Sequence, residues 1–223
     1  MTPDRLRERI AAHLDPIAGW DPAEEPRQSD YDLAPEFRPT DPPRLRDAAV
    51  LIPIVDRPEG LTVLLTRRAD TLASHSGQIA FPGGRLEPGE GPVAAAVREA
   101  CEEIGLDPVL VEPLGLSTRY ETVTSFVVTP VVGLVQPDFT LALNPAEVAE
   151  AFEAPFAFLM DPANHRKDSY DLAGRKRWFY AMPWGERYIW GATAGMLRAL
   201  WDRLYGDGEE APVISRASAR DIL

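Results

Sequence analysis

The chain has 223 residues, of which 45% are hydrophobic, enough for one main domain with a sizeable core. Its 35 acidic and 23 basic residues give a net charge of −12, which excludes the broad positive surface that nucleic acid or an anionic membrane requires. The sequence contains one cysteine, Cys101, no uncharged apolar run of about 18 residues and no signal-peptide pattern. We therefore expect a cytoplasmic protein without disulfides.

Residues 1–45 are expected to form a short helix followed by an extended arm. Apolar residues recur at four-residue spacing from Leu6 to Leu14, which predicts an amphipathic helix capped by Thr2. Residues 16–43 are rich in proline and acidic side chains. This composition is typical of an extended linker that lies outside the core.

Residues 46–206 are expected to form the main domain, and residues 207–223 a tail. Runs rich in Val, Leu, Ile and Thr predict a hairpin at residues 48–66, later strands at 111–120, 125–135, 175–184 and 187–190, and a final helix at 193–204. The segment 144–152 is interpreted as one or two helical turns. Strands and helices without a regular alternation predict an α+β fold or an α/β/α sandwich with a mixed sheet.

The stretch VREACEEIG, residues 97–105, predicts a helix with an unusual concentration of acids. Glu99, Glu102 and Glu103 share one face within about one turn, opposite an apolar stripe on which Cys101 is expected to be buried. Unit charges about 5.5 Å apart at an effective dielectric near 20 repel by on the order of 3 kcal/mol. A bound cation would offset that repulsion, and a solvated acidic face is the alternative.

The loop before this helix, FPGGRLEPGEGP at residues 81–92, is rich in glycine and proline. Such a loop indicates a sharp turn or a close approach of backbone to a ligand, and it can supply a carbonyl ligand beside the acids. Glu90 lies at the start of the helix, where the helix dipole favours a carboxylate. Oxygen ligands alone favour Mg²⁺ or Mn²⁺, and zinc is disfavoured because the histidines and Cys101 are widely separated.

These residues together resemble the Nudix box, G-x5-E-x7-R-E-U-x-E-E-x-G-U with U apolar. Gly84, Glu90, Arg98, Glu99, Ala100, Glu102, Glu103, Gly105 and Leu106 match every defined position. The resemblance implies the Nudix fold, a mixed sheet between helices. It also implies hydrolysis of a nucleoside diphosphate linked to another group.

A narrower resemblance covers residues 64–84, LLTRRADTLASHSGQIAFPGG, which are similar to the signature of the coenzyme A pyrophosphatase branch of that family. The departure is Ala73, where the branch has arginine. The resemblance implies hydrolysis of coenzyme A or acyl-CoA to 4′-phosphopantetheine, or its acyl form, and adenosine 3′,5′-bisphosphate. The alternatives are another nucleoside diphosphate conjugate, such as ADP-ribose, a dinucleotide or an oxidised nucleotide, and a Nudix module that binds a nucleotide without turnover.

The resemblance also implies roles for individual residues. The metal ligands are expected to be Glu99, Glu102, Glu103 and the carbonyl of Gly83. The catalytic set is completed by Arg98, which orients the acids, and by Glu90. Glu99 is also a candidate base, with Glu147 as a distant alternative. The expected substrate contacts are Arg67, Arg68, Phe81 and Gly84.

Two basic segments, residues 166–170 and 174–178, stand out in an acidic chain. They are candidates for the 3′-phosphate of coenzyme A, and ordinary hairpin surface is the alternative. The aromatic residues near them are interpreted as core or dimer contacts, so a homodimer is also considered. These aromatic residues are Trp178, Phe179, Tyr180, Trp184 and Trp190.

Overall fold

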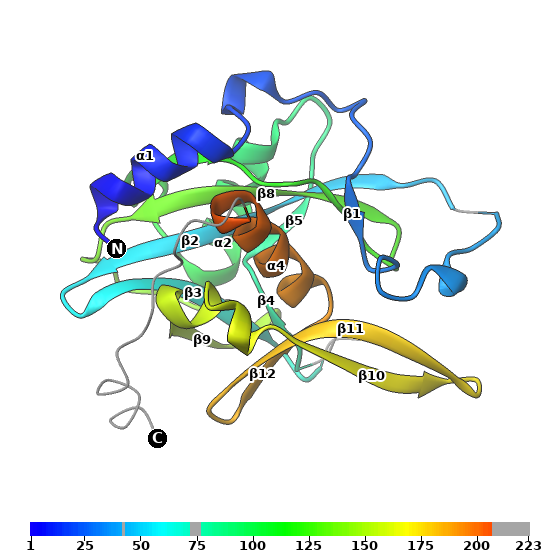
Figure 1. The fold of residues 1–223 in the computed structure, drawn as a ribbon. Coiled ribbons are helices and arrows are strands. Elements are labelled where there is room, and N and C mark those ends of the chain that lie inside the picture. The colour runs from blue at the N-terminus through cyan, green and yellow to red at the C-terminus, as the bar shows by residue number, and fades with distance from the viewer. Residues whose placement is uncertain (42, 72–76, 207–223) are drawn as a thin grey trace.

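The computed structural model describes residues 1–41, 43–71 and 77–206 (Figure 1). The helices are α1 (Pro3–His13), α2 (Pro92–Ile104), α3 (Phe156–Leu159) and α4 (Ala192–Tyr205). The strands are β1 (Gln28–Ser29), β2 (Arg46–Arg57), β3 (Gly60–Arg68), β4 (Ile79–Ala80), β5 (Gly83–Arg85), β6 (Val111–Leu116), β7 (Tyr120–Glu121), β8 (Phe126–Val135), β9 (Val148–Pro155), β10 (Arg166–Leu172), β11 (Arg175–Trp184) and β12 (Arg187–Trp190). None of the helices in these ranges combines the length and the apolarity needed to cross a membrane.

The main sheet has nine strands, in the order β1-β7-β8-β2-β3-β4, with β5 also paired to β2, β6 to β8 and β9 to β3. Because β2 pairs in parallel with β8 and antiparallel with β3, the sheet is mixed, as predicted. A second sheet, β10-β11-β12, is antiparallel and extends beside the main sheet in Figure 1. The hairpin expected at residues 48–66 is formed by β2 and β3.

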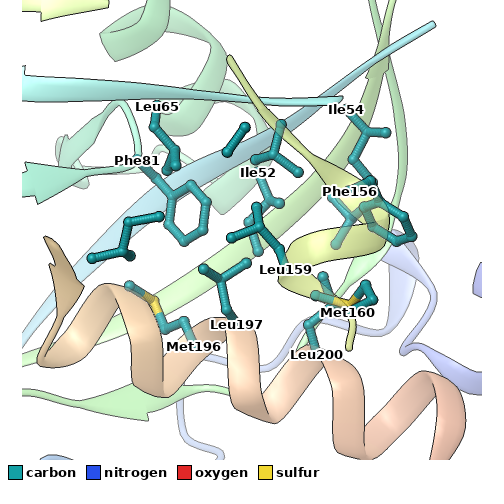
Figure 2. Close-up of a cluster of buried hydrophobic side chains, with 14 of the residues drawn as sticks. Ile52, Ile54, Leu65, Phe81, Phe156, Leu159, Met160, Met196, Leu197 and Leu200 are labelled. Atoms are coloured by element: carbon teal, nitrogen blue, oxygen red, sulfur yellow. The ribbon is translucent and has the colours of Figure 1, made fainter. Parts of the chain in front are cut away.

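Alternate side chains of the central strands point to opposite faces of the main sheet, and each face is covered by helices. Ile52, Ile54 and Leu65 pack in one core layer with α1, α3 and α4, as Figure 2 shows for α3 and α4. Leu51 and Leu64 pack in the other layer with α2. This two-residue alternation is what a sheet buried on both sides requires. The expected arrangement of a mixed sheet between helices is therefore confirmed.

The N-terminal segment belongs to the core, which corrects the prediction of an extended arm outside it. Leu6 of α1 is fully buried, and Tyr31 and Ala34, beyond the helix, are 7% and 0% exposed. β1 pairs in parallel with β7, so part of this segment adds a strand to the main sheet. The proline and acid content did not predict this packing, because a few apolar side chains and one strand pairing are enough to hold a segment against the main domain.

The segment 144–152 also differs from its prediction as helical turns. After a turn it forms β9, which pairs antiparallel with β3 over seven registered residue pairs. β3 offers an edge with unpaired backbone groups, and pairing with that edge outweighs the local helix preference of the alanines and glutamates.

We expect Leu197→Ala to lower the free energy of unfolding by about 2 to 5 kcal/mol. Leu197 is fully buried on α4 and faces the sheet in Figure 2, so truncation removes apolar contacts and leaves a cavity. Urea denaturation would measure the change. Val109→Ala is the control, since Val109 is 76% exposed and its truncation should change stability by less than about 0.5 kcal/mol. Equal effects of the two substitutions would contradict this description of the core.

Candidate functional site

Helix α2 begins and ends at residues that suit those positions. Pro92 occupies its first turn, and Gly105 ends it with φ of 67°, in the left-handed region that favours glycine. The N–H of Gly105 donates to the carbonyls of Ala100 and Cys101, which closes the last turn. The start and the end of the acidic helix are therefore fixed by local chemistry.

The buried face of α2 is not the predicted one. Its buried residues are Pro92, Ala95, Ala96, Ala100, Glu103 and Ile104. This face is rotated by roughly 100° from the apolar stripe expected around Val97. Cys101 is consequently exposed, and Glu103 is only 4% exposed. We attribute the difference to the small alanine side chains, which let the helix lie close against the sheet and carry Glu103 into the interior.

Arg98 connects the acids of the helix to the loop before it. Its Nε and Nη2 donate to the two carboxylate oxygens of Glu90, both at 2.9 Å. Its Nη1 donates to Glu99 at 2.9 Å and to Glu102 at 3.3 Å, and Nη2 also donates to the Arg85 carbonyl at 3.1 Å. All five N–H groups of the guanidinium thus have an acceptor. Arg98 thus contacts both Glu99 and Glu102.

Gly83 and Gly84 in β5 lie so close to their neighbours that a side chain does not fit. A Cβ on Gly83 would be 2.4 Å from the Ala49 carbonyl oxygen, and a Cβ on Gly84 would be 2.3 Å from a carboxylate oxygen of Glu99. The backbone N–H of Gly83 donates to Glu103 at 3.3 Å. The glycines of the loop therefore bring backbone into direct contact with two of the acids.

The electrostatics of the three helix acids differ because their burial differs. Burial raises the pKa of Glu103 to about 7, against the opposing effects of the Gly83 N–H and of nearby Arg68. Burial also raises the pKa of Glu99, and the hydrogen bond from Arg98 opposes this shift. The Glu102 side chain is 58% exposed. Burial disfavours the charged form of a carboxylate, and a nearby cation would stabilise that charged form.

The loop that carries Glu147 docks on the end of α2. The N–H groups of Ala142 and Asn144 donate to the carbonyls of Ile104 and Glu103, each at 2.9 Å. The Asn144 side-chain amide donates to Glu147 at 3.1 Å. The negative charge of Glu147 contributes to the raised pKa values of Glu99 and Glu103. The structure thus brings Glu147 close to the helix acids.

The donor set of these acids fits a hard divalent cation. Glu99, Glu102, Glu103 and the Gly83 carbonyl offer only oxygen, and Glu103 is buried without an ion pair to any described residue. In the described ranges no three Asp, Glu, His or Cys side chains are gathered as a ready metal cluster. The rotamers of Glu99 and Glu102 are those of ion pairs with Arg98, so metal binding would require these carboxylates to turn.

A cleft of about 650 Å³ opens beside the loop, between the main sheet, the second sheet and the start of α4. Of the expected substrate contacts, Arg68, Phe81 and Gly84 line this cleft. Arg67 does not line it, and instead forms ion pairs with Asp70 at 2.8 Å and Glu150 at 3.8 Å. In the described structure Arg68 has no ion pair, and its buried Nε has no hydrogen-bond partner.

The two basic segments that are candidates for the 3′-phosphate of coenzyme A each contribute one residue to the cleft, Tyr170 and Arg177. The cleft also includes residues that the sequence analysis did not assign to a site, namely Arg46, Phe126, Phe179 and Trp190, together with residues of the 122–124 turn. Phe179 and Trp190 were interpreted as core or dimer contacts, and the structure places both on the cleft wall, with ring centroids 5.1 Å apart. The feature of the sequence that could have indicated this cleft wall is the repeated occurrence of basic residues next to aromatic residues in the two C-terminal basic segments.

Two sequence features lie outside the described residues. Ala73, the departure from the coenzyme A pyrophosphatase signature, falls in the undescribed range 72–76. The predicted tail, residues 207–223, is likewise not described.

Comparison with known proteins gives one consistent family. A family model described as the NUDIX domain matches residues 45–173. An uncharacterized Nudix hydrolase NudL from Cronobacter sakazakii is 41% identical over 157 residues, covering 70% of this chain and 81% of that protein. A NudL protein from Escherichia coli O1:K1 is 43% identical over 159 residues with the same coverage. The solved Nudix hydrolase RenU from M. smegmatis is 26% identical, with 50% of this chain and 71% of that chain covered and a TM-score of 0.43.

In metal-free protein, we expect Glu103→Gln to increase stability at pH 8 more than at pH 5. A carboxyl whose pKa is about 7 when folded binds more protons in the folded state than in the unfolded state between pH 4.5 and 7. The free energy of unfolding therefore falls as the pH rises through that window, by about 3 kcal/mol for a shift of this size. Glutamine cannot ionise and still offers an oxygen to the Gly83 N–H.

Urea denaturation in EDTA at the two pH values measures this difference. Glu102→Gln is the matched control, because it removes the same charge from a side chain on the same helix that is 58% exposed. A Glu103→Gln effect that is equal at pH 5 and pH 8 would show that burial does not hold the carboxyl in its neutral form.

Proposed function

Because this chain belongs to the Nudix hydrolase family and is a hydrolase of pyrophosphate bonds, we propose that its substrate is coenzyme A or acyl-CoA. The products would be 4′-phosphopantetheine, or its acyl form, and adenosine 3′,5′-bisphosphate. The observation that carries this proposal is that Arg68, Phe81 and Gly84, all from the segment resembling the coenzyme A pyrophosphatase signature, line one cleft. That cleft adjoins the acids of α2 through Gly84.

Arg68 is the residue best suited to bind the diphosphate. It lies at the end of β3, its positive charge lowers the pKa of Glu103, and its Nε is buried without a partner in the described chain. An unsatisfied buried donor is costly, and a phosphate oxygen would supply its missing acceptor. Arg67, held by Asp70 and Glu150, would support the strand end without contacting the substrate.

Glu99, Glu102, Glu103 and the Gly83 carbonyl would hold Mg²⁺ or Mn²⁺. Such an ion, when bound, neutralises charge on the bridging phosphates and lowers the pKa of a coordinated water. Arg98 and Glu90 hold the helix against its loop, so the acids keep their positions while the carboxylates turn toward a ligand. Glu99 and Glu147 are the two candidate bases, since both carboxylates lie beside the buried Glu103.

We propose that residues 46–206 form the catalytic unit and that the enzyme acts in the cytoplasm on small nucleotides. The N-terminal segment contributes to the cleft through Asp30. A different nucleoside diphosphate conjugate is the second candidate substrate, because Ala73 stands where the branch signature has arginine. A module that binds without turnover is disfavoured, since all the acids of the box are retained.

A hydrolysis panel of coenzyme A, acetyl-CoA, ADP-ribose and 8-oxo-dGTP tests the substrate. We expect turnover that depends on Mg²⁺ or Mn²⁺ and ceases in EDTA, with the highest kcat/KM for coenzyme A or its acyl form. Phosphate-containing products would be identified by mass spectrometry. Equal or faster hydrolysis of ADP-ribose would refute the coenzyme A assignment and leave the family assignment intact.

We expect Glu103→Gln to lower kcat by at least about 10²-fold, the usual scale for loss of a key charged group. The substitution keeps the size and the acceptor of the side chain and removes only the charge. Glu87→Gln is the control, because Glu87 lies in the same loop with an exposed side chain and should keep the native rate. A near-native kcat for Glu103→Gln would show that the metal site is misassigned.

A further inference from the structure

The arginines that line the cleft differ from most other arginines in the described structure. Arg46, Arg68, Arg85 and Arg177 line the cleft, and none of them forms an ion pair within the described ranges. Ten other arginines do form one: Arg7, Arg27, Arg38, Arg57, Arg67, Arg98, Arg119, Arg187, Arg198 and Arg203. In a chain with 35 acidic residues, four cations without carboxylate partners in one cleft indicate an anionic ligand.

These four arginines are spread along the cleft. Arg68 lies near Glu103, and the N–H of Gly83 donates to the same carboxylate. Gly83 pairs with Val50, four residues from Arg46 at the start of β2, so Arg46 lies about 13 Å along the strand from the position beside the acids. Arg85 lies between them, because its own pairing places it two residues from Arg46. A diphosphate held beside the acids would therefore leave Arg46 for another part of the ligand.

Arg177 lies at the same end of the cleft as Arg46. The Nη2 of Arg46 donates to the Thr124 carbonyl at 3.3 Å, and its guanidinium lies 4.1 Å from the Phe126 ring centroid. Arg177 packs on the ring of Tyr31, at 5.7 Å. Tyr31 follows Asp30, whose carboxylate accepts from the N–H of Val123, so both arginines adjoin the same 122–124 turn.

Tyr31 is positioned to hold the Arg177 guanidinium. Tyr31 is 7% exposed, and its other contact is the guanidinium of Arg38 at 4.8 Å. Arg38 is itself fixed by an ion pair with Glu121 at 2.7 Å. The one cleft carboxylate nearby, Asp30, already accepts from the Tyr120 hydroxyl at 3.1 Å and the Val123 N–H at 2.9 Å. Arg177 is thus oriented by an aromatic ring and keeps its N–H donors for a ligand.

Aromatic side chains line the cleft together with these arginines. Tyr170 and Phe179 have ring centroids 5.7 Å apart, and Phe179 and Trp190 are 5.1 Å apart. Aromatic rings and arginine planes are the usual surface on which a nucleobase stacks. A ligand with a diphosphate, a base and a further anion would match the cleft along its length.

We propose that Arg46 and Arg177 form a second anion site, which binds a phosphate monoester on the ribose of a nucleotide substrate, and that Tyr31 positions Arg177. If the proposed function holds, this group is the 3′-phosphate of coenzyme A. The site then distinguishes coenzyme A from dephospho-coenzyme A, which lacks only that phosphate. The N-terminal segment acquires a role in specificity through Tyr31.

The test compares kcat and KM for coenzyme A and dephospho-coenzyme A in wild type, Arg46→Met and Arg177→Met. Loss of a charge-assisted hydrogen bond should raise KM for coenzyme A by about 10- to 100-fold and change KM for dephospho-coenzyme A by less than about twofold. Lys176→Met is the matched control, since it removes one charge from the neighbouring position on the opposite face of β11. Equal losses on both substrates, or no loss, would overturn the proposal.

The role of Tyr31 is tested by a measurement that distinguishes positioning of Arg177 from support of the fold. Tyr31→Leu should raise KM for coenzyme A with kcat unchanged, and Tyr31→Phe should restore the wild-type KM because a phenyl ring still packs on the guanidinium. A fall in kcat on both substrates would show that Tyr31 only supports the fold.

A calorimetric comparison of the affinities for adenosine 3′,5′-bisphosphate and adenosine 5′-monophosphate tests the second anion site separately from the proposed function, because binding is measured without turnover. Tighter binding of the bisphosphate in wild type, lost in Arg177→Met, would support the second anion site even if coenzyme A is not hydrolysed. Hydrolysis of coenzyme A by wild type with the same affinity for both nucleotides would keep the proposed function and exclude the second anion site.

Discussion

The interaction on which the site depends is the bidentate ion pair between Arg98 and Glu90. It ties the helix that carries the acids to the loop that carries the glycines, and it uses the guanidinium fully, because the remaining donors bind Glu99, Glu102 and the Arg85 carbonyl. The pair is partly buried, with Arg98 25% and Glu90 13% exposed. Removing either partner would leave a charge in a poorly solvated position, so helix and loop are held as one unit.

Within that unit, close packing places the acids where their charge is costly. The alanine face of α2 lies against the main sheet, and Gly84 lets Glu99 approach the backbone of β5. Glu103 accepts the Gly83 N–H and has no ion pair among the described residues, and its burial raises its pKa. A protein that holds a carboxylate this way loses stability on ionisation, and a bound cation would recover it. In the function that we propose, stability is thus reduced at the position where the reaction would require a negative charge.

The loop before α2 lines one side of the cleft, and most of the remaining wall comes from parts of the chain outside the acidic helix and that loop. The second sheet supplies Tyr170, Arg177, Phe179 and Trp190 along one wall. The N-terminal segment docks against that wall through Tyr31 and contributes Asp30. In the function that we propose, hydrolysis and substrate selection are carried by different elements. The acids of α2 would serve the reaction, while the second sheet and the N-terminal segment would set specificity.

The sequence by itself determined the features that depend on local chemistry. The ends of α2, the β2–β3 hairpin, the alternation of buried residues and the identity of the acids follow from residue spacing and from what proline and glycine permit. Only the tertiary structure decided which face of α2 is buried, that residues 144–152 pair with β3, and that Arg68 and not Arg67 lines the cleft. These outcomes depend on partners distant in sequence: small alanines that allow close packing, an open strand edge, and two acids that hold Arg67. Tyr31 and Arg177 come into contact for the same reason, because contacts between segments more than 100 residues apart are decided when the chain packs.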